Sequence, residues 1–143
     1  MKTTFISLFF LCLMNTCYSQ NTINEVLVRT NWSGIHCRGT NGICSINDNK
    51  QQANTKLIYK ENTLTFIIDR TKLSATEVLQ IVREPLLEDA DQQNLNFIME
   101  DDFLIDPTMQ NQLKINNSQA ALSKGVYPVQ ITDTSFIIVF NLQ

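Results

Sequence analysis

The sequence predicts an α+β fold: a small antiparallel sheet of about six strands, two or three short helices and one disulfide-closed loop. Segments with alternating apolar residues recur along the chain, turn-forming residues separate them, and short stretches with helical spacing lie between them. Because strands and helices alternate irregularly, without an internal repeat or a low-complexity linker, we expect one domain with its helices on one face of the sheet.

The segments 24–32 and 56–69 are the first predicted strands. Residues 24–32 alternate in polarity as far as Trp32. Residues 56–69 form two strands joined by a tight turn at Glu61 and Asn62. The apolar set expected on one face of this hairpin is Leu57, Tyr59, Leu64, Phe66 and Ile68.

The first predicted helix covers residues 74–84. Ser74 and Glu77 have the spacing of a capping box, in which each side chain satisfies a free backbone N–H of the other residue. Val78 and Val82 share one helical face, and Pro85 should end or kink the helix.

Two further short helices are expected in the second half of the chain. Asp106 followed by Pro107 favours a helix over 107–113, because proline suits the first helical turn. A third helix is expected between Asn117 as its cap and Gly125 as its left-handed stop.

The C-terminal half also carries strands. Residues 95–100 predict one strand, and residues 126–132 and 135–142 predict a hairpin. The last strand is apolar on both faces, which is typical of a central or doubly covered strand. Pro128 indicates that its partner lies at an edge or begins late.

The N-terminus has the layout of a secretory signal peptide. Lys2 precedes a short apolar run, and small residues stand at Cys17 and Ser19. We expect cleavage after Ser19, which leaves a single exported domain over 20–143. The signal resembles those of small secreted proteins of Gram-negative bacteria. The apolar run is too short to span a bilayer, and we predict no transmembrane span.

Two alternatives to free secretion remain. Cleavage before Cys17 with lipid attached to its thiol would give a lipoprotein, although Met14, Asn15 and Thr16 fit such a signal poorly. The second alternative is that the N-terminal segment is not cleaved and forms a first helix buried in the fold. The expected location is secreted, periplasmic or associated with the outer membrane.

Charge is unevenly distributed along the mature chain. Residues 20–72 carry seven basic and four acidic side chains, whereas residues 73–143 carry three basic and ten acidic ones. Such a dipole can orient a protein against a charged partner, but acidic residues on solvated helix ends and turns are the favoured explanation. No basic patch interleaved with aromatic residues occurs, so we expect no nucleic-acid partner.

Cys37 and Cys44 are the two cysteines left after cleavage. A close even pair in an exported protein predicts a disulfide. Gly39 and Gly42 between them let the backbone turn so that the two thiols can meet. We expect a stapled, glycine-rich loop.

A metal or redox site built on His36, Cys37 and Cys44 is the alternative. Zinc commonly takes four ligands, and a carboxylate such as Asp48 would have to supply the fourth. The cysteine spacing differs from the Cys-x-x-Cys of redox enzymes and from the haem attachment motif. We therefore predict neither a metal nor a cofactor.

Trp32, His36 and Arg38 are the predicted contact residues, since Trp and Arg dominate binding hot spots. Trp32 could equally be a core residue beneath the loop. The partner is expected to be a protein, for example in an outer-membrane or surface complex, or else a saccharide.

No catalytic residues are predicted. His36 is the only histidine available as a base. Glu100, Asp101, Asp102 and Asp106 offer material for a paired-carboxylate site, but Asp101 and Asp102, between a strand and an apolar run, indicate an ordinary turn. The sequence therefore predicts an exported, non-enzymatic binding or accessory module of the bacterial cell envelope or exterior. A secreted inhibitor with a stapled loop is a third hypothesis.

Overall fold

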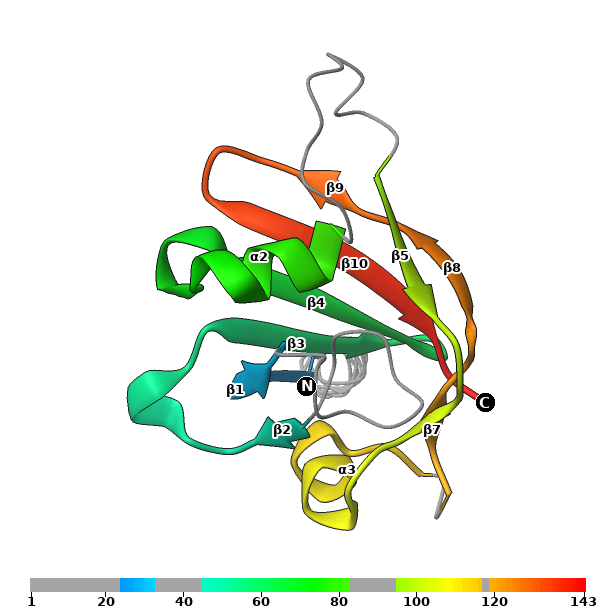
Figure 1. Cartoon of the computed structure of the whole chain (residues 1–143). Coiled ribbons are helices and arrows are strands. Elements are labelled where there is room, and N and C mark those ends of the chain that lie inside the picture. Colours follow the sequence, from blue (N-terminus) through cyan, green and yellow to red (C-terminus); the bar gives the residue numbers. More distant parts are fainter. Residues whose placement is uncertain (1–23, 33–44, 83–94, 117–118) are drawn as a thin grey trace, which may run out of the picture.

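A six-stranded antiparallel sheet forms the centre of the molecule (Figure 1). The computed structural model describes residues 24–32, 45–82, 95–116 and 119–143. In spatial order the strands of the sheet are β2 (Ser45–Asn47), β1 (Asn24–Asn31), β3 (Thr55–Lys60), β4 (Thr63–Asp69), β10 (Ser135–Asn141) and β9 (Gln130–Ile131).

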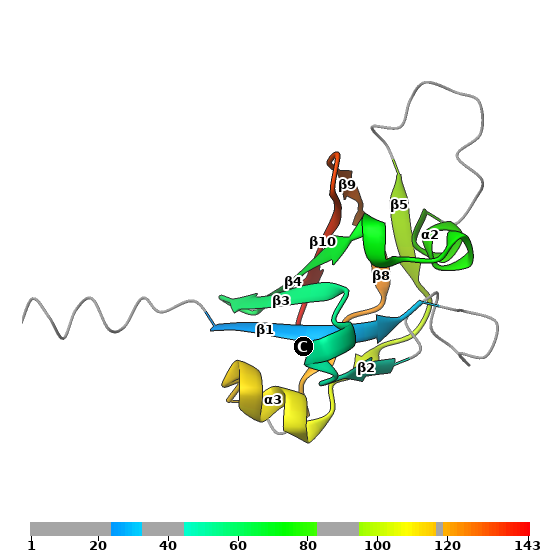
Figure 2. The ribbon, with the colours of Figure 1, turned by 90° about the vertical axis from the view of Figure 1, so that its left-hand side faces the viewer.

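Short elements cover one face of this sheet. Figure 2 shows α2, β5 and β8 on the same side of β3, β4 and β10. Among the described residues, the elements outside the six-stranded sheet are two 3₁₀ helices, two α-helices and four short strands. In chain order they are η2 (Lys50–Gln52), η3 (Arg70–Lys72), α2 (Ala75–Val82), β5 (Asn96–Met99), β6 (Phe103–Leu104), α3 (Pro107–Leu113), β7 (Ala121–Leu122) and β8 (Gly125–Pro128). β5 pairs with β8 and β6 with β7, both antiparallel. The predicted α+β class with six sheet strands is confirmed.

The β3–β4 hairpin follows from its sequence. Glu61 and Asn62 have φ values of 49° and 59°, which are those of a two-residue turn that matches the twist of the flanking strands. The hydroxyl of Thr63 donates to the carbonyl of Lys60 and closes the turn. This confirms the turn that the sequence predicts.

Strict alternation along the strands builds the core. One face of the sheet is buried against β5, β8, α2 and α3. Successive side chains of each strand point alternately to this inner face and to the opposite, outer face. The fully buried side chains of this inner face are Val28, Leu57, Leu64, Phe66, Ile68, Phe136, Ile138 and Phe140.

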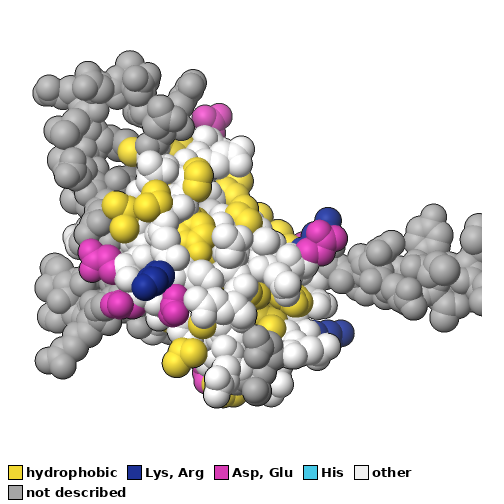
Figure 3. Space-filling model, turned by 90° about the vertical axis from the view of Figure 1, so that its right-hand side faces the viewer, with side chains coloured by type: hydrophobic (Ala, Val, Ile, Leu, Met, Phe, Trp, Pro, Cys, Tyr) yellow, Lys and Arg dark blue, Asp and Glu magenta, His cyan; other side chains and the backbone are white. Residues whose placement is uncertain are grey.

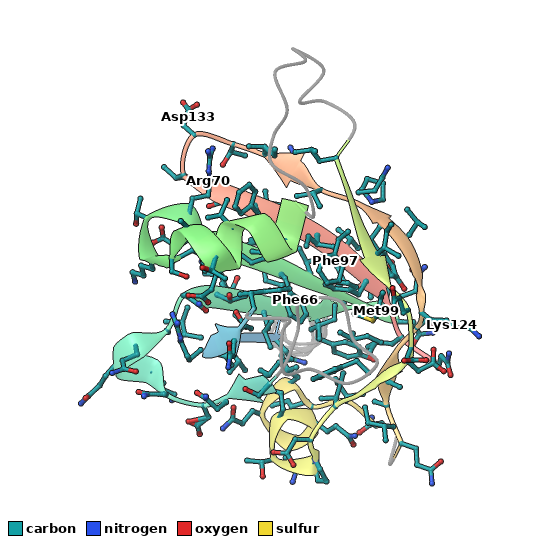
Figure 4. All side chains as sticks on the ribbon, viewed as in Figure 1. Phe66, Arg70, Phe97, Met99, Lys124 and Asp133 are labelled. Atoms are coloured by element: carbon teal, nitrogen blue, oxygen red, sulfur yellow. The ribbon has the colours of Figure 1, made fainter. Side chains whose placement is uncertain are left out.

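Four aromatic rings form a closed cluster at the centre of this core. Phe66 contacts Trp32 and Phe140 with ring centroids 6.0 and 4.8 Å apart, and Phe97 contacts the same two rings at 5.7 Å each. All four contacts are edge-to-face, the arrangement that aromatic quadrupoles favour. Figure 4 shows Phe66 of the sheet and Phe97 of β5 in the interior between the two layers.

Asn54 extends the pairing of β1 and β3 beyond the first residue of β3. Its side-chain oxygen accepts from the N–H and hydroxyl of Thr30 and from the hydroxyl of Thr55. Its amide nitrogen donates to the carbonyl of Thr30. A buried side chain therefore replaces a backbone partner in the sheet.

Helix α2 begins with the predicted capping box. The N–H of Ser74 donates to Glu77 Oε1 at 3.3 Å, and the N–H of Glu77 donates to Ser74 Oγ at 3.2 Å. Glu77 also accepts from Arg29 Nη2 at 3.2 Å, which ties the helix to β1.

Replacing the cap should weaken the fold measurably. We expect Ser74→Ala to lower the free energy of unfolding by about 1 kcal/mol, because the N–H of Glu77 loses its acceptor. Thr76→Ala, at an exposed position of the same helix, should change it by less than half as much. Urea denaturation of both variants measures the difference, and equal effects would contradict the role of the cap.

The second predicted helix is confirmed, and the third is wrong. α3 spans the predicted residues 107–113. Residues 121–122, expected to be helical, instead form β7 and pair with Phe103 and Leu104 of β6. Gly125 does not stop a helix but begins β8 with a φ of 152°.

The C-terminal hairpin is only partly as predicted. β9 pairs with β10 through Ile131 opposite Phe136. The preceding segment, β8, pairs with β5 instead and ends at Pro128, and the N–H of Val129 still donates to the carbonyl of Leu95 at 2.8 Å.

In the described part of the chain, no helix is long and apolar enough to cross a membrane.

Candidate functional site

Trp32 belongs to the core and not to a contact surface, which corrects the sequence prediction for this residue. Its side chain has no exposed area and contacts Phe66 and Phe97. The physical reason is the alternation of β1, which places Val28 and Thr30 inward and directs Trp32 after them into the same core.

The other predicted site residues lie outside the described residues. These are the contact residues His36 and Arg38 and the cysteines Cys37 and Cys44 of the expected disulfide, and they remain predictions. Within the ranges that the structure describes, no group of three or more His, Cys, Asp or Glu side chains is placed to hold a metal ion.

The carboxylates of residues 100–102 occupy the turn that the sequence indicates. They are exposed between β5 and β6. Asp102 Oδ1 accepts from the N–H of Lys124 at 2.8 Å and so joins this turn to the chain before β8. The contact gives Asp102 a structural role.

The outer face of the six-stranded sheet carries an unexpected apolar surface. Strand register aligns Leu27, Lys56, Ile67 and Ile137 in one cross-strand row on β1, β3, β4 and β10. A second row, two residues further along, contains Glu25, Ile58, Thr65 and Val139 on the same strands. We call the five aliphatic residues of these rows the outer apolar face: Leu27, Ile58, Ile67, Ile137 and Val139.

These side chains remain open to solvent although they stand in the middle of the sheet. Leu27 is 50% exposed and Val139 is 47% exposed, and the three isoleucines are half-buried. The layer of α2, β5 and β8 lies on the opposite side of the sheet (Figure 2). An exposed aliphatic surface on one sheet face, here interrupted by Lys56 and Thr65, is typical of a site where another molecule binds.

The signal for this face is present in the sequence but is ambiguous. Ile67 next to Ile68, and Ile137 to Val139 in the last strand, are apolar on both faces. This pattern predicts a strand covered on both sides. The structure confirms that β10 is an internal strand, between β4 and β9, but shows exposed area on its second face.

A hollow of about 320 Å³ lies at one end of the outer apolar face. Its walls include the aliphatic Leu27 and Ile67 and three lysines, Lys50, Lys56 and Lys72. A second hollow of about 410 Å³ shares Leu27 and Lys50 with the first and continues toward Glu25 and Gln112. The shared residues make the two hollows parts of one groove, which we call the lysine groove.

Asp69 is the acidic side chain among the described residues of the first hollow, and one of its carboxylate oxygens already accepts two hydrogen bonds. Oδ1 accepts from the hydroxyl of Thr71 at 2.6 Å and from its N–H at 2.9 Å. The hydroxyl of Thr71 is the main cause that holds the pKa of Asp69 below its ordinary value. Burial opposes this lowering of the pKa, whereas the N–H of Thr71 and the charge of Lys72 add to it.

Asp69→Asn should reveal a small pH-dependent stabilisation. A carboxylate whose pKa is depressed in the folded state stabilises the fold above its unfolded pKa and loses this effect as pH falls through the folded value. The amide can still accept from Thr71, so only the charge changes. We expect the variant to be less stable near neutral pH by less than about 1 kcal/mol, since solvent screens the site. Denaturation near pH 2 should show no difference, and a constant difference would contradict this cause.

Other exposed apolar side chains are isolated from this face. Leu104 on β6 is 71% exposed and Val126 on β8 is 62% exposed. Figure 3, which faces the side of the molecule with β5 and β8, shows several apolar patches separated by backbone and uncharged side chains, with a few charged side chains among them. These two residues therefore provide matched controls for the outer apolar face.

Comparison of the chain with protein-family models, curated proteins and solved structures finds no match.

Proposed function

We propose that this protein is an exported, non-enzymatic binding or accessory module of the bacterial cell envelope or exterior, and that it contacts a protein partner through the outer apolar face. The observation that carries the proposal is the alignment of Leu27, Ile58, Ile67, Ile137 and Val139 in two adjacent rows on one open sheet face.

The dimensions of this face suit a protein partner. Rows that cross four strands extend over roughly 15 Å, since neighbouring strands lie about 4.8 Å apart. Burial of apolar surface contributes roughly 25 cal/mol per Å², so half-exposed aliphatic side chains gain free energy when a partner covers them. The threonine and lysine side chains between them would supply polar contacts, as in the mixed interfaces of separable complexes.

A charge placed on this face tests the proposal. Tagged wild-type protein and the variants Val139→Glu and Val126→Glu would be purified from the native host, and the retained partners quantified. We expect Val139→Glu to lose at least nine tenths of a partner that wild type and Val126→Glu retain, because the new carboxylate would be buried in the interface. Both positions are exposed strand residues, so both variants should fold, which circular dichroism verifies.

Equal retention by the two variants would contradict the proposed site. Loss with Val126→Glu alone would place the contact on β8 instead.

Export and the disulfide have their own test. The intact mass of protein from its native host should begin at Gln20, and two thiols should be alkylated only after reduction. Two thiols free without reduction would contradict the disulfide and favour the metal or redox alternative at His36, Cys37 and Cys44. A lipid-sized mass on Cys17 would replace free secretion with membrane anchoring.

A further inference from the structure

The lysine groove concentrates positive charge at one end of the outer apolar face. Among the described residues, its first hollow is lined by Lys50, Lys56 and Lys72 and by one acidic side chain, Asp69, whose Oδ1 accepts from Thr71. Glu25 lines the second hollow. We infer that the protein partner presents an acidic polypeptide segment to the lysine groove, and that aliphatic side chains flank the carboxylates of this segment. This inference rests on the proposed function.

The lysines of the hollow differ in their availability from Arg29 and Arg70, the two arginines that the structure describes. Arg29 is paired with Glu77, and Arg70 donates to the carbonyl of Thr132 and stacks over the ring of Phe136. The side chains of Lys50 and Lys56, by contrast, are exposed and make no hydrogen bond or ion pair with the described residues. Their charges are free for a ligand.

The ammonium group of Lys72 already makes one hydrogen bond within the protein. Its Nζ donates to the carbonyl of Ala53 at 3.3 Å, which holds the ammonium group over the groove. An ammonium group carries three donors, so this contact leaves capacity for a carboxylate. The first hollow thus offers one cation positioned by a hydrogen bond and two cations that no described side chain engages.

The position of Lys56 indicates which side chains the acidic segment of the partner should carry. Leu27 and Ile67 are its direct cross-strand neighbours on either side, each about one strand spacing of roughly 5 Å away. A carboxylate that reaches Lys56 therefore lies between two aliphatic side chains. Apolar groups beside the carboxylate would cover them, whereas a uniformly charged segment would leave them uncovered.

The lining favours a polypeptide over a charged saccharide. No aromatic side chain is among the described residues of the first hollow, so there is no ring on which a sugar can stack. Thr134 and Ser135 add hydroxyl groups that can bond to a peptide backbone. Aliphatic walls, hydroxyls and ammonium groups together match an extended acidic peptide.

Titration of the full mature chain with a defined probe tests the inference. The probe is a capped five-residue peptide in which glutamate alternates with leucine and valine, and its control has glutamine in place of glutamate. We expect amide shifts in the nuclear magnetic resonance spectrum at Leu27, Lys56, Ile67 and Ser135, and at least fivefold weaker binding of the glutamine peptide. Sodium chloride at 0.5 M should weaken binding of the glutamate peptide, because exposed ion pairs are screened.

A double substitution tests whether the charges of Lys50 and Lys56 bind the glutamate peptide. Lys50→Gln with Lys56→Gln should weaken the glutamate peptide about fivefold to tenfold, as expected when two exposed ion pairs are lost. Lys60→Gln with Lys124→Gln changes the net charge equally at exposed positions outside the first hollow, and should change affinity less than twofold. Equal binding of both peptides, shifts elsewhere, or equal effects of the two double variants would overturn the inference. Binding of an oligogalacturonate at these residues in place of the peptide would also overturn it.

Failure of this inference can be separated from failure of the proposed function. If Val139→Glu loses the native partner while Lys50→Gln with Lys56→Gln retains it, the outer apolar face is the site but acidic recognition is wrong. If the partner is retained by all variants, both are wrong.

Discussion

Phe140→Ala should cause the largest loss of stability among single substitutions of the sheet, about 3–5 kcal/mol. Phe140 is fully buried and its ring contacts those of Phe66, Phe97 and Tyr127. Truncation removes these contacts and leaves a cavity between the sheet and β5. Because domains of this size are stable by only about 5–15 kcal/mol, chemical denaturation should show a clear shift of the midpoint.

The neighbouring residue provides the control for Phe140. Val139 lies on the same strand but faces outward and is 47% exposed. Val139→Ala should lower the free energy of unfolding by less than about 1 kcal/mol. Similar losses for both variants would contradict the assignment of the inner and outer faces of β10.

Asn54→Ala should be nearly as harmful, with an expected loss of about 3–4 kcal/mol. The side chain of Asn54 makes four hydrogen bonds to Thr30 and Thr55, at 2.9 to 3.1 Å. Alanine would leave the buried N–H and carbonyl of Thr30 without these partners. We expect faster amide hydrogen exchange at Thr30 together with the loss of stability.

Asn141→Ala is the matched control for Asn54. Asn141 ends β10 with an exposed side chain, so its truncation should change stability by less than about 0.5 kcal/mol. Comparable denaturation midpoints for the two alanine variants would show that the side chain of Asn54 does not hold β1 against β3.

Local chemistry in the sequence was sufficient to predict the elements that carry their own signals. The turn at Glu61 and Asn62, the capping box of Ser74 and Glu77, and the helix after Asp106 all depend on residues within a few positions of each other. The turn and the capping box could be predicted because their hydrogen-bonding groups are satisfied locally. The helix could be predicted because Pro107 suits the first helical turn, although the Asp106 side chain makes no capping hydrogen bond.

The elements that depend on distant partners could not be predicted. Ala121 and Leu122 suit a helix, but they pair with β6 and are buried, so tertiary contacts override their propensity. β6, β7 and β9 have two residues each, which is too short to show periodicity. Pairing of β8 with β5 likewise requires knowledge of the packed layers.

The candidate site was missed for a related reason. Trp32 was a predicted contact because tryptophan is common in interfaces, yet the alternation of β1 places it in the core. The outer apolar face joins residues of β1, β3, β4 and β10 that are distant in the sequence. Only the strand register brings Leu27 into one row with Ile67 and Ile137.

Site-specific photo-crosslinking in the native host tests the central claim most directly. A photoreactive amino acid would replace Val139 in one strain and Val126 in another, at exposed strand positions on different parts of the surface. We predict that position 139 crosslinks to one protein partner and that position 126 does not. Absence of a crosslink from position 139, or the same partner from both positions, would contradict a binding role for the outer apolar face.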